Sequence, residues 1–377
     1  MPPTSKTPLD LEELRIALLA AGTPWNSSTT TMTQLDETQR VERLGVPLPS
    51  TAELKAREGQ PAAMAARAHE VGDGGIGLPA AFDARNVYGA NYTTGIKDQA
   101  NCGSCVAFGT VAALETTAAY TRGQPGLKLD LSEAHLFYTH GPSTGASCGN
   151  GWWPDYAMAA CRDIGITYEE YFPYSAGNTS GAVLNGDWPN RLARIPGFVD
   201  MTGNPAAMKQ HIYAYGALTA CFVVYQDFFS YSSGVYRHVS GGVAGGHCVA
   251  LVGWDDSQGC WIAKNSWGAG WGDGGYVRIG YGEGYIEDYP GTHPTVIGAT
   301  GVMLRAWLNN SRILGLWTSA NDLNAWAYAQ NMGWLKLTAG SAVSQHSMLI
   351  ELTAAKGAAR PVNLFQDNGT LAENYVL

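Results

Sequence analysis

The chain has 377 residues, which is enough for two or three domains, each with a core of its own. A composition of 45% hydrophobic and 15% charged residues is typical of globular proteins and excludes a disordered chain. The net charge of -9, with no run of Lys or Arg, argues against a nucleic-acid partner, and no apolar run approaches the roughly 20 residues that span a membrane.

Residues 1–77 have the pattern of a strap rather than of a domain. The leucines of EELRIALLAAG have helical spacing, and Asp36 can cap a short helix that ends at Gly45. An Ala- and Gly-rich stretch, residues 52–77, then predicts a flexible tether. Acidic residues and an arginine interrupt the first apolar run, so the start lacks the pattern of a signal peptide.

The middle of the chain changes from a helical to a strand pattern. Helices are predicted where apolar residues recur every three to four positions, at residues 105–120, 131–141 and 154–165. Strands are predicted between Gly-rich turns, at residues 217–225, 247–256, 260–268 and 275–281. A helical half followed by a β half predicts an α+β fold with a cleft between the halves.

Residues 295–377 have the pattern of a separate, small all-β domain. Short apolar runs alternate with Asn, Gly and Asp turns, and HSMLIELTAAKGAA is compatible with one helix. The aromatic content favours a small β-barrel or sandwich, with the tryptophans in its core rather than in a sugar-binding platform: Trp307, Trp317, Trp326 and Trp334. Because the unit offers no nucleophile beside a base, a module that binds a glycan or a protein is favoured over a second enzyme, with a permanent packing partner as the alternative.

Four residues of the middle segment have the chemistry of nucleophilic catalysis. Cys105 is placed at a helix start, where the helix dipole and free N–H groups stabilise a thiolate. His247 is a candidate base, Asn265 can orient it through a side-chain carbonyl, and Gln99 can donate an N–H to an oxyanion. The Cys105 backbone N–H is the second oxyanion donor.

Several motifs in order make the sequence resemble a papain-like cysteine protease, of the peptidase C1 family. They are KDQANCGSC, LSEA, CGNGWWPDYA, GHCVALVGW and KNSWGAGWGDGGYVRI, with His247 and Asn265 lying 142 and 160 residues after Cys105. The resemblance implies a papain-like two-lobed fold, a helical lobe plus a β-barrel-like lobe, for a catalytic domain at residues 78–290. It implies a cysteine peptidase without a metal or another cofactor, which we expect to be a monomeric, bacterial-type member that cleaves proteins or peptides.

Carried over by position, the resemblance gives each catalytic residue a role. Cys105 is then the nucleophile, His247 the base and acid, Asn265 the orienting group and Gln99 the oxyanion donor. Trp267 corresponds to the indole that shields the His–Asn hydrogen bond from water. The implied substrate-binding residues are Gly103, Ser104, Gly149, Asn150, Gly151, Trp153, Pro154, Gly246 and Trp267. Trp152, Trp153 and Pro154 would form an apolar wall, which predicts a hydrophobic or aromatic side chain at the second residue before the scissile bond.

The sequence departs from the family pattern at three positions. Val106 stands where Trp is usual, Gly109 where Ser is usual, and Gly246 where papain has Asp. Val106 narrows one flank of the substrate groove, and Gly246 can alter the pH profile of the activity. Because no His-His pair is present to block the cleft, an endopeptidase is favoured over an enzyme that removes dipeptides.

Other functions remain as alternatives. A redox Cys-x-x-Cys pair needs a thioredoxin-like βαβ pattern, and the remaining Cys and His residues lack zinc-site spacing. A papain-fold acyl or peptide transferase, or an idle binding scaffold, could carry the same motifs. The complete set of four catalytic residues argues against the scaffold.

The resemblance also implies structural roles. It pairs Cys102 with Cys148 in a disulfide, and it makes Glu115, Glu133 and Lys264 a buried ionic cluster between the lobes. Cys161, Cys221 and Cys248 are expected in the core. Most histidines are expected at the surface or as satisfied core residues, with His69 and His293 in linkers.

By position, residues 1–77 resemble an inhibitory pro-segment. We expect it to lie through the cleft and to be cut between about Pro61 and Leu78. The expected disulfide favours a secreted or extracytoplasmic location.

Overall fold

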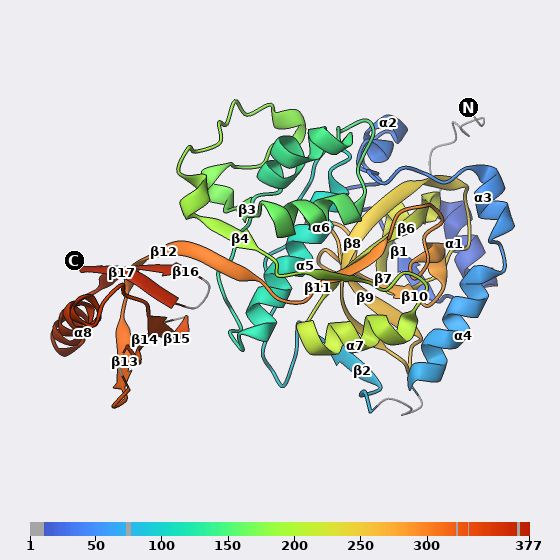
Figure 1. The fold of residues 1–377 in the computed structure, drawn as a ribbon. Helices are drawn as coiled ribbons and strands as arrows, with labels where there is room; N and C mark the ends of the chain where they lie inside the picture. Colours follow the sequence, from blue (N-terminus) through green and yellow to red (C-terminus); the bar gives the residue numbers. More distant parts are fainter. Residues whose placement is uncertain (1–10, 73–76, 322, 331, 368–369) are drawn as a thin grey trace.

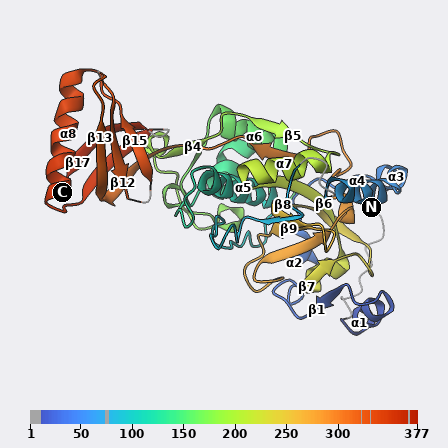
Figure 2. The same cartoon turned by 90° about the horizontal axis from the view of Figure 1, so that it is seen from below.

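The computed structural model of the chain describes residues 11–72, 77–321, 323–330, 332–367 and 370–377. An N-terminal segment lies on a two-lobed central part, and a C-terminal unit lies at the opposite end of the molecule (Figures 1 and 2). This arrangement agrees with the predicted α+β fold.

The N-terminal segment is more helical than its sequence suggested. Its elements are α1 (Leu11–Ala20), β1 (Trp25–Ser27), α2 (Glu37–Val41), α3 (Thr51–Ala56) and α4 (Gln60–Gly72). Asp36 caps α2, as predicted, but the flexible tether expected over residues 52–77 is wrong as far as Gly72. Ala, Gln, Glu and Arg are strong helix formers, and Ser50 supplies a cap for α3, so this stretch is ordered where it rests on the central part. Residues 73–76 of the tether lie outside the described residues.

The central part divides into a helical lobe and a sheet lobe. Its main helices are α5 (Cys105–Thr121), α6 (Pro154–Asp163) and α7 (Pro205–Tyr215). In place of the predicted second α-helix, the chain forms a π-helix over His135–His140 and a 3-10 helix over Gly141–Thr144. The larger sheet joins nine strands of the described chain in the order β1-β7-β10-β9-β8-β6-β11-β5, with β2 beside β8. These strands are β2 (Ala81–Asp83), β5 (Phe198–Asp200), β6 (Leu218–Tyr225), β7 (Tyr231–Tyr236), β8 (Val243–Asp255), β9 (Cys260–Lys264), β10 (Tyr276–Gly280) and β11 (Val296–Ala299).

The C-terminal unit is a sheet with one helix rather than a barrel or a sandwich. Its elements are β12 (Met303–Ser311), β13 (Ile313–Thr318), β14 (Ala325–Ala329), β15 (Gly333–Leu337), α8 (Ala342–Gly357), β16 (Val362–Asp367) and β17 (Thr370–Val376). The strand order β13-β14-β15-β17-β16-β12 continues into β4 (Leu192–Arg194) and β3 (Ile166–Thr167) of the central part. The predicted core position is wrong for Trp317 and Trp334, which are half exposed because only the opposite face of the sheet is covered by α8.

Helix α5 is buried over most of its length, and this burial encloses a carboxylate. Glu115 and Glu133 are both 1% exposed, and Lys97 Nζ lies 3.3 Å and 2.9 Å from their carboxylate oxygens. Lys264, the cation that the resemblance implied, is linked to the cluster through Thr94: its Nζ donates to Thr94 Oγ1 at 2.7 Å, and that hydroxyl donates to Glu115 Oε2. The cluster therefore exists, with Lys97 at its centre.

We expect Lys97→Ala to lower the free energy of unfolding by about 3–5 kcal/mol, because it leaves two buried carboxylates without their cation. Urea unfolding in a Cys105→Ala background measures the change without self-digestion. The exposed Lys128 gives a matched control, Lys128→Ala, which should change stability little. Equal losses in the two variants would contradict the role of the cluster.

Candidate active site

Cys105 is the first residue of α5 and is fully buried. The first turns of the helix lie against β8, where glycine permits a close approach: a methyl group at Gly109 would lie 3.1 Å from Cys248 Sγ. This contact gives a physical reason for Gly109 in place of the usual Ser. It also brings the start of α5 beside the β8 stretch that carries His247.

His247 and Asn265 are joined by a hydrogen bond of 2.8 Å between His247 Nε2 and Asn265 Oδ1. Ser266 N donates to the same Asn265 oxygen at 2.8 Å, which fixes the orientation of the amide. Because an amide oxygen can only accept, His247 Nε2 carries the proton. The other ring nitrogen, Nδ1, is buried and has no hydrogen-bond partner among the described residues.

The indole of Trp267 lies against this pair. Its ring centroid is 4.6 Å from that of His247, and Trp267 is fully buried. This position matches the shielding role expected from the sequence. With the N-terminal segment in place the side chain is fully buried, so its contact with a substrate stays a prediction.

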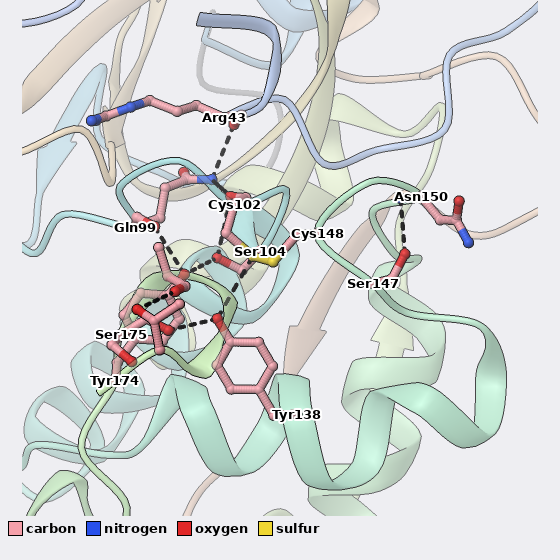
Figure 3. The surroundings of a disulfide bond; sticks show 12 residues. Arg43, Gln99, Cys102, Ser104, Tyr138, Ser147, Cys148, Asn150, Tyr174 and Ser175 are labelled. Carbon is pink, nitrogen blue, oxygen red and sulfur yellow. Dashed lines mark hydrogen bonds between the residues drawn. A yellow bond between two sulfur atoms is a disulfide. The ribbon is translucent and has the colours of Figure 1, made fainter. Parts of the chain in front are cut away.

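Gln99 is locked by three hydrogen bonds of its side chain. Its Nε2 donates to the carbonyls of Arg43 and Cys102 at 3.0 Å and 2.9 Å (Figure 3). Its Oε1 accepts from Ser266 Oγ at 2.7 Å. The donor that the sequence assigned to an oxyanion is therefore occupied by a carbonyl of the N-terminal segment.

Residues 43–47 of that segment, called the plug below, lie in the cleft. Val46 N donates to Gly246 O at 3.0 Å, Trp152 N donates to Gly45 O at 2.8 Å, and the Tyr289 hydroxyl donates to Pro47 O at 3.0 Å. The plug is thus held mainly through hydrogen bonds of its backbone, so a change in the backbone conformation of residues 43–47 would break them.

Glycines on both sides make room for the plug. A methyl group at Gly45 would lie 2.0 Å from Gly103 O, and one at Gly151 would lie 2.2 Å from Gly45 O. A methyl group at Gly246 would lie 2.6 Å from Val46 O. Three glycines predicted to bind substrate therefore surround this segment of the chain.

The remaining predicted cleft residues lie in different surroundings. Gly149 lines a hollow of about 470 Å³ between the cleft and α2, and Asn150 lies in the same exposed loop. Ser104 is buried, with its hydroxyl 2.7 Å from the Tyr174 hydroxyl, and Pro154 is buried at the start of α6. The side chains of Ser104 and Pro154 are therefore not exposed in the cleft.

Trp153 is half-buried and stacks on His293, with ring centroids 4.6 Å apart. His293 in turn lies 3.0 Å from Asp155 through Nδ1. It is more than a linker residue, and no motif in the sequence signalled it. The N-terminal segment was expected to lie through the cleft, but Tyr289 and the residues that form the plug were missed, because their positions depend on how distant segments pack together.

Burial determines the protonation state of the site. It raises the pKa of the Cys105 thiol, an effect that Cys248 reinforces and that backbone hydrogen bonds from Gly45, Cys248 and Val106 only partly offset. Burial also lowers the pKa of His247 to about 4, against the effect of its bond to Asn265. Under the plug, the thiol and the imidazole are therefore both neutral at pH 7.

A disulfide between Cys102 and Cys148 joins the loop before α5 to the loop that carries Gly149. Figure 3 shows it beside Gln99 and Ser104. Gly103 N also donates to Cys148 O at 3.0 Å, so the two loops are joined twice. In the described residues, Cys105, Cys161, Cys221, Cys248 and Cys260 are free.

Comparisons with known proteins agree with this geometry. Residues 78–290 match the family described as papain family cysteine protease. A gut-specific cysteine proteinase of Caenorhabditis elegans is 32% identical over 238 residues, which are 55% of this chain and 70% of that protein. Cathepsin B-like CP2 of Giardia intestinalis is 34% identical over 215 residues, which are 54% of this chain and 69% of that protein.

Solved precursor structures have the same fold. ProCathepsin B S9 from Trypanosoma congolense matches with a TM-score of 0.60 at 23% identity, over 78% of this chain and 99% of its own. Procathepsin L 3 of Tenebrio molitor matches with a TM-score of 0.57 at 23% identity, over 77% of this chain and 87% of its own. No helix in the described part of the chain is both long and apolar enough for a membrane span.

Because the family match covers residues 78–290, more than half of the chain, the chain belongs to the papain family of cysteine proteases and is a cysteine peptidase.

Proposed function

We propose that the chain is the zymogen of an endopeptidase with Cys105 as nucleophile, His247 as base and acid, and Asn265 as orienting group. The observation that carries this proposal is the His247–Asn265 hydrogen bond of 2.8 Å, beside the helix start where Cys105 lies. It fixes the imidazole so that Nδ1 is the nitrogen left to exchange a proton with the thiol.

The reaction proceeds through an acyl-enzyme once the cleft is open. His247 takes the proton of Cys105, and the thiolate attacks the carbonyl carbon of the substrate peptide bond. The amides of Gln99 and Cys105 stabilise the oxyanion. His247 then protonates the leaving amine, the thioester forms, and water activated by His247 releases the acid and the free thiol.

The plug blocks this reaction in two ways. Arg43 O occupies the Gln99 amide, so a substrate carbonyl cannot accept the same hydrogen bond. Burial keeps the thiol and the imidazole neutral, so the reactive ion pair is absent. Removal of residues 1–77 would reverse both effects.

The packing of Val46 supports the expected preference for a hydrophobic residue. Val46 is 4% exposed, and a methyl group on Gly246 would lie 3.1 Å from its Cβ and 2.2 Å from the Tyr289 hydroxyl. We infer that Val46 occupies the pocket for the second residue before the scissile bond. Trp153 lies at the side of Tyr289, with ring centroids 6.5 Å apart, and would form one wall.

The three-part division at residues 1–77, 78–290 and 295–377 is part of the proposal, as is a cut between Pro61 and Leu78. Within that window, the backbone of α4 is hydrogen-bonded within the helix and would have to unwind before it could be cut. A bacterial-type origin stays a prediction.

A transferase would use the same acyl-enzyme with an amine acceptor in place of water.

The first prediction concerns the nucleophile. After removal of residues 1–77, we expect hydrolysis of fluorogenic peptides with a hydrophobic residue at that second position. Cys105→Ala should abolish it, and Asn265→Ala should lower kcat at least about a hundredfold, because the imidazole loses its orientation. Cys161→Ala, which removes another buried thiol, is the matched control and should keep activity.

Cleavage by Cys105→Ala at the wild-type rate would disprove the assignment. Product masses recorded with and without an added amine separate hydrolysis from acyl transfer. Transfer products that exceed hydrolysis would favour the transferase.

The second prediction concerns the plug. Gly45→Ala in the full chain should raise the rate at which iodoacetamide labels Cys105 by about tenfold or more, because the new methyl group cannot fit against Gly103 O. Mass spectrometry identifies the labelled cysteine. Gly59→Ala, where a methyl group would meet nothing within 4 Å, is the control and should leave the rate unchanged. An unchanged rate in Gly45→Ala would show that the plug does not cover Cys105.

The third prediction concerns pH. In the full chain the thiol pKa is raised, so thiolate formation, and with it labelling of Cys105, should increase about tenfold per pH unit between pH 6 and 8. Once residues 1–77 are removed, an ion pair with His247 should hold the thiolate across this range, and the profile should become nearly flat. Parallel pH profiles for the two forms would contradict the proposed control of ionisation.

A further inference from the structure

The sheet of the C-terminal unit has one face covered by α8 and one face without a covering element in the described chain. In β14, Ala325, Ala327 and Ala329 are buried on the α8 side, and the intervening Trp326 and Tyr328 point the other way. The same alternation in β15 buries leucines on the α8 side and leaves Trp334 on the open face.

On this open face, three indoles surround a hollow of about 600 Å³. It is lined by Trp317, Trp326, Trp334 and the amide side chain of Asn324. Trp317 and Trp326 are directly paired across β13 and β14, and Trp317 and Trp334 are 49% and 48% exposed. Large aromatic side chains left half exposed on adjacent strands commonly mark a binding surface. The volume lies within the roughly 300–1,000 Å³ of small-ligand sites.

Two of the three rings, Trp326 and Trp334, are held in place before any ligand binds. Trp326 Nε1 donates to Asn324 Oδ1 at 3.0 Å, and Asn324 Nδ2 donates to Ser319 Oγ at 2.7 Å. Tyr328 packs edge-on against Trp334, with ring centroids 5.4 Å apart. A site whose side chains are already fixed loses little conformational entropy on binding.

We propose that this hollow binds a neutral polysaccharide chain, whose sugar rings stack on Trp317 and Trp334. A pyranose ring has an apolar C–H face that matches an indole and a rim of hydroxyls that matches an amide or an indole N–H. Among the described residues, the lining itself contains planar rings and one amide, which favours a neutral ligand; Lys336, paired with Trp326 across β14 and β15, is a charged neighbour on the same face.

Two other ligand classes fit less well. A stacking site for single-stranded nucleic acid also needs a positively charged groove, which this lining lacks and which the net charge of -9 disfavours. A protein interface mixes aromatic anchors with aliphatic and charged contacts over a larger area, whereas this hollow is lined by indoles and an amide alone.

Strand pairing and a hydrogen bond join the unit that carries the hollow to the central part. β12 pairs with β4 of the central part, where Met303 lies opposite Arg194, and Arg191 Nη1 donates to Trp307 O at 2.6 Å. A polysaccharide bound at the hollow would therefore keep the cleft close to proteins embedded in or attached to that polysaccharide.

The test uses the full chain carrying Cys105→Ala, so that self-digestion does not occur. Its co-sedimentation with insoluble cellulose, chitin, xylan and starch is measured, and the affinity for a soluble oligosaccharide of the best polymer is determined by calorimetry. We expect binding to at least one polymer, and a loss of about tenfold in affinity for Trp317→Ala and for Trp334→Ala. Ile350→Ala removes an exposed apolar side chain from α8, on the other face of the sheet, and should not change the affinity.

Thermal melting confirms that each variant is folded, and Trp317→Phe, which keeps an aromatic ring, should bind better than Trp317→Ala. Absence of binding to all four polymers would overturn the proposal. So would binding that survives the double Trp317→Ala, Trp334→Ala change, or tryptophan-dependent binding to neutral lipid vesicles or to unglycosylated protein in place of the polymers.

Discussion

The burial of α5 is the constraint on which the rest of the catalytic part depends. Almost every residue from Cys105 to Ala119 is inaccessible to water, so the helix has no polar face and needs neighbours on all sides. β8 and β6 cover one side, and α6 covers another. Two consequences follow: Cys105 is pressed against the strand that carries His247, and Glu115 must find its cation inside the protein.

Contacts of the main chain, more than contacts of side chains, hold the plug in the cleft. Gly45 is placed between Gly103 and Gly151 at distances that no other residue would permit, and the neighbouring contacts of the plug use main-chain atoms. Side-chain identity matters where a methyl group would collide, as at Gly45, and where a side chain makes its own contacts, as Arg43 does with Asp98 and Asn101.

Local sequence predicted most helices and strands of the central part, because each has its own spacing of apolar residues. It failed where the outcome depends on packing between distant segments. The Ala-rich stretch before Gly72 is helical because the central part supports it, Lys97 joins the ion cluster expected from Glu115, Glu133 and Lys264, and no local signal marks residues 43–47 as the plug over Gln99. The prediction that the tryptophans of the C-terminal unit are in its core failed for a related reason. Alternation in a strand predicts two faces, but only the fold decides which face is covered.

The two ends of the molecule can act in sequence rather than together. Figures 1 and 2 show the N-terminal segment and the C-terminal unit on opposite sides of the central part. The hollow around Trp317 is lined only by residues of the C-terminal unit, so its shape does not depend on whether the plug is in place. Binding at the hollow therefore does not require removal of the plug, and an inactive precursor could be concentrated on a polysaccharide before cleavage exposes Cys105. Since the strands β4 and β12 join the hollow to the central part, the activated peptidase would stay on that surface after the N-terminal segment has left.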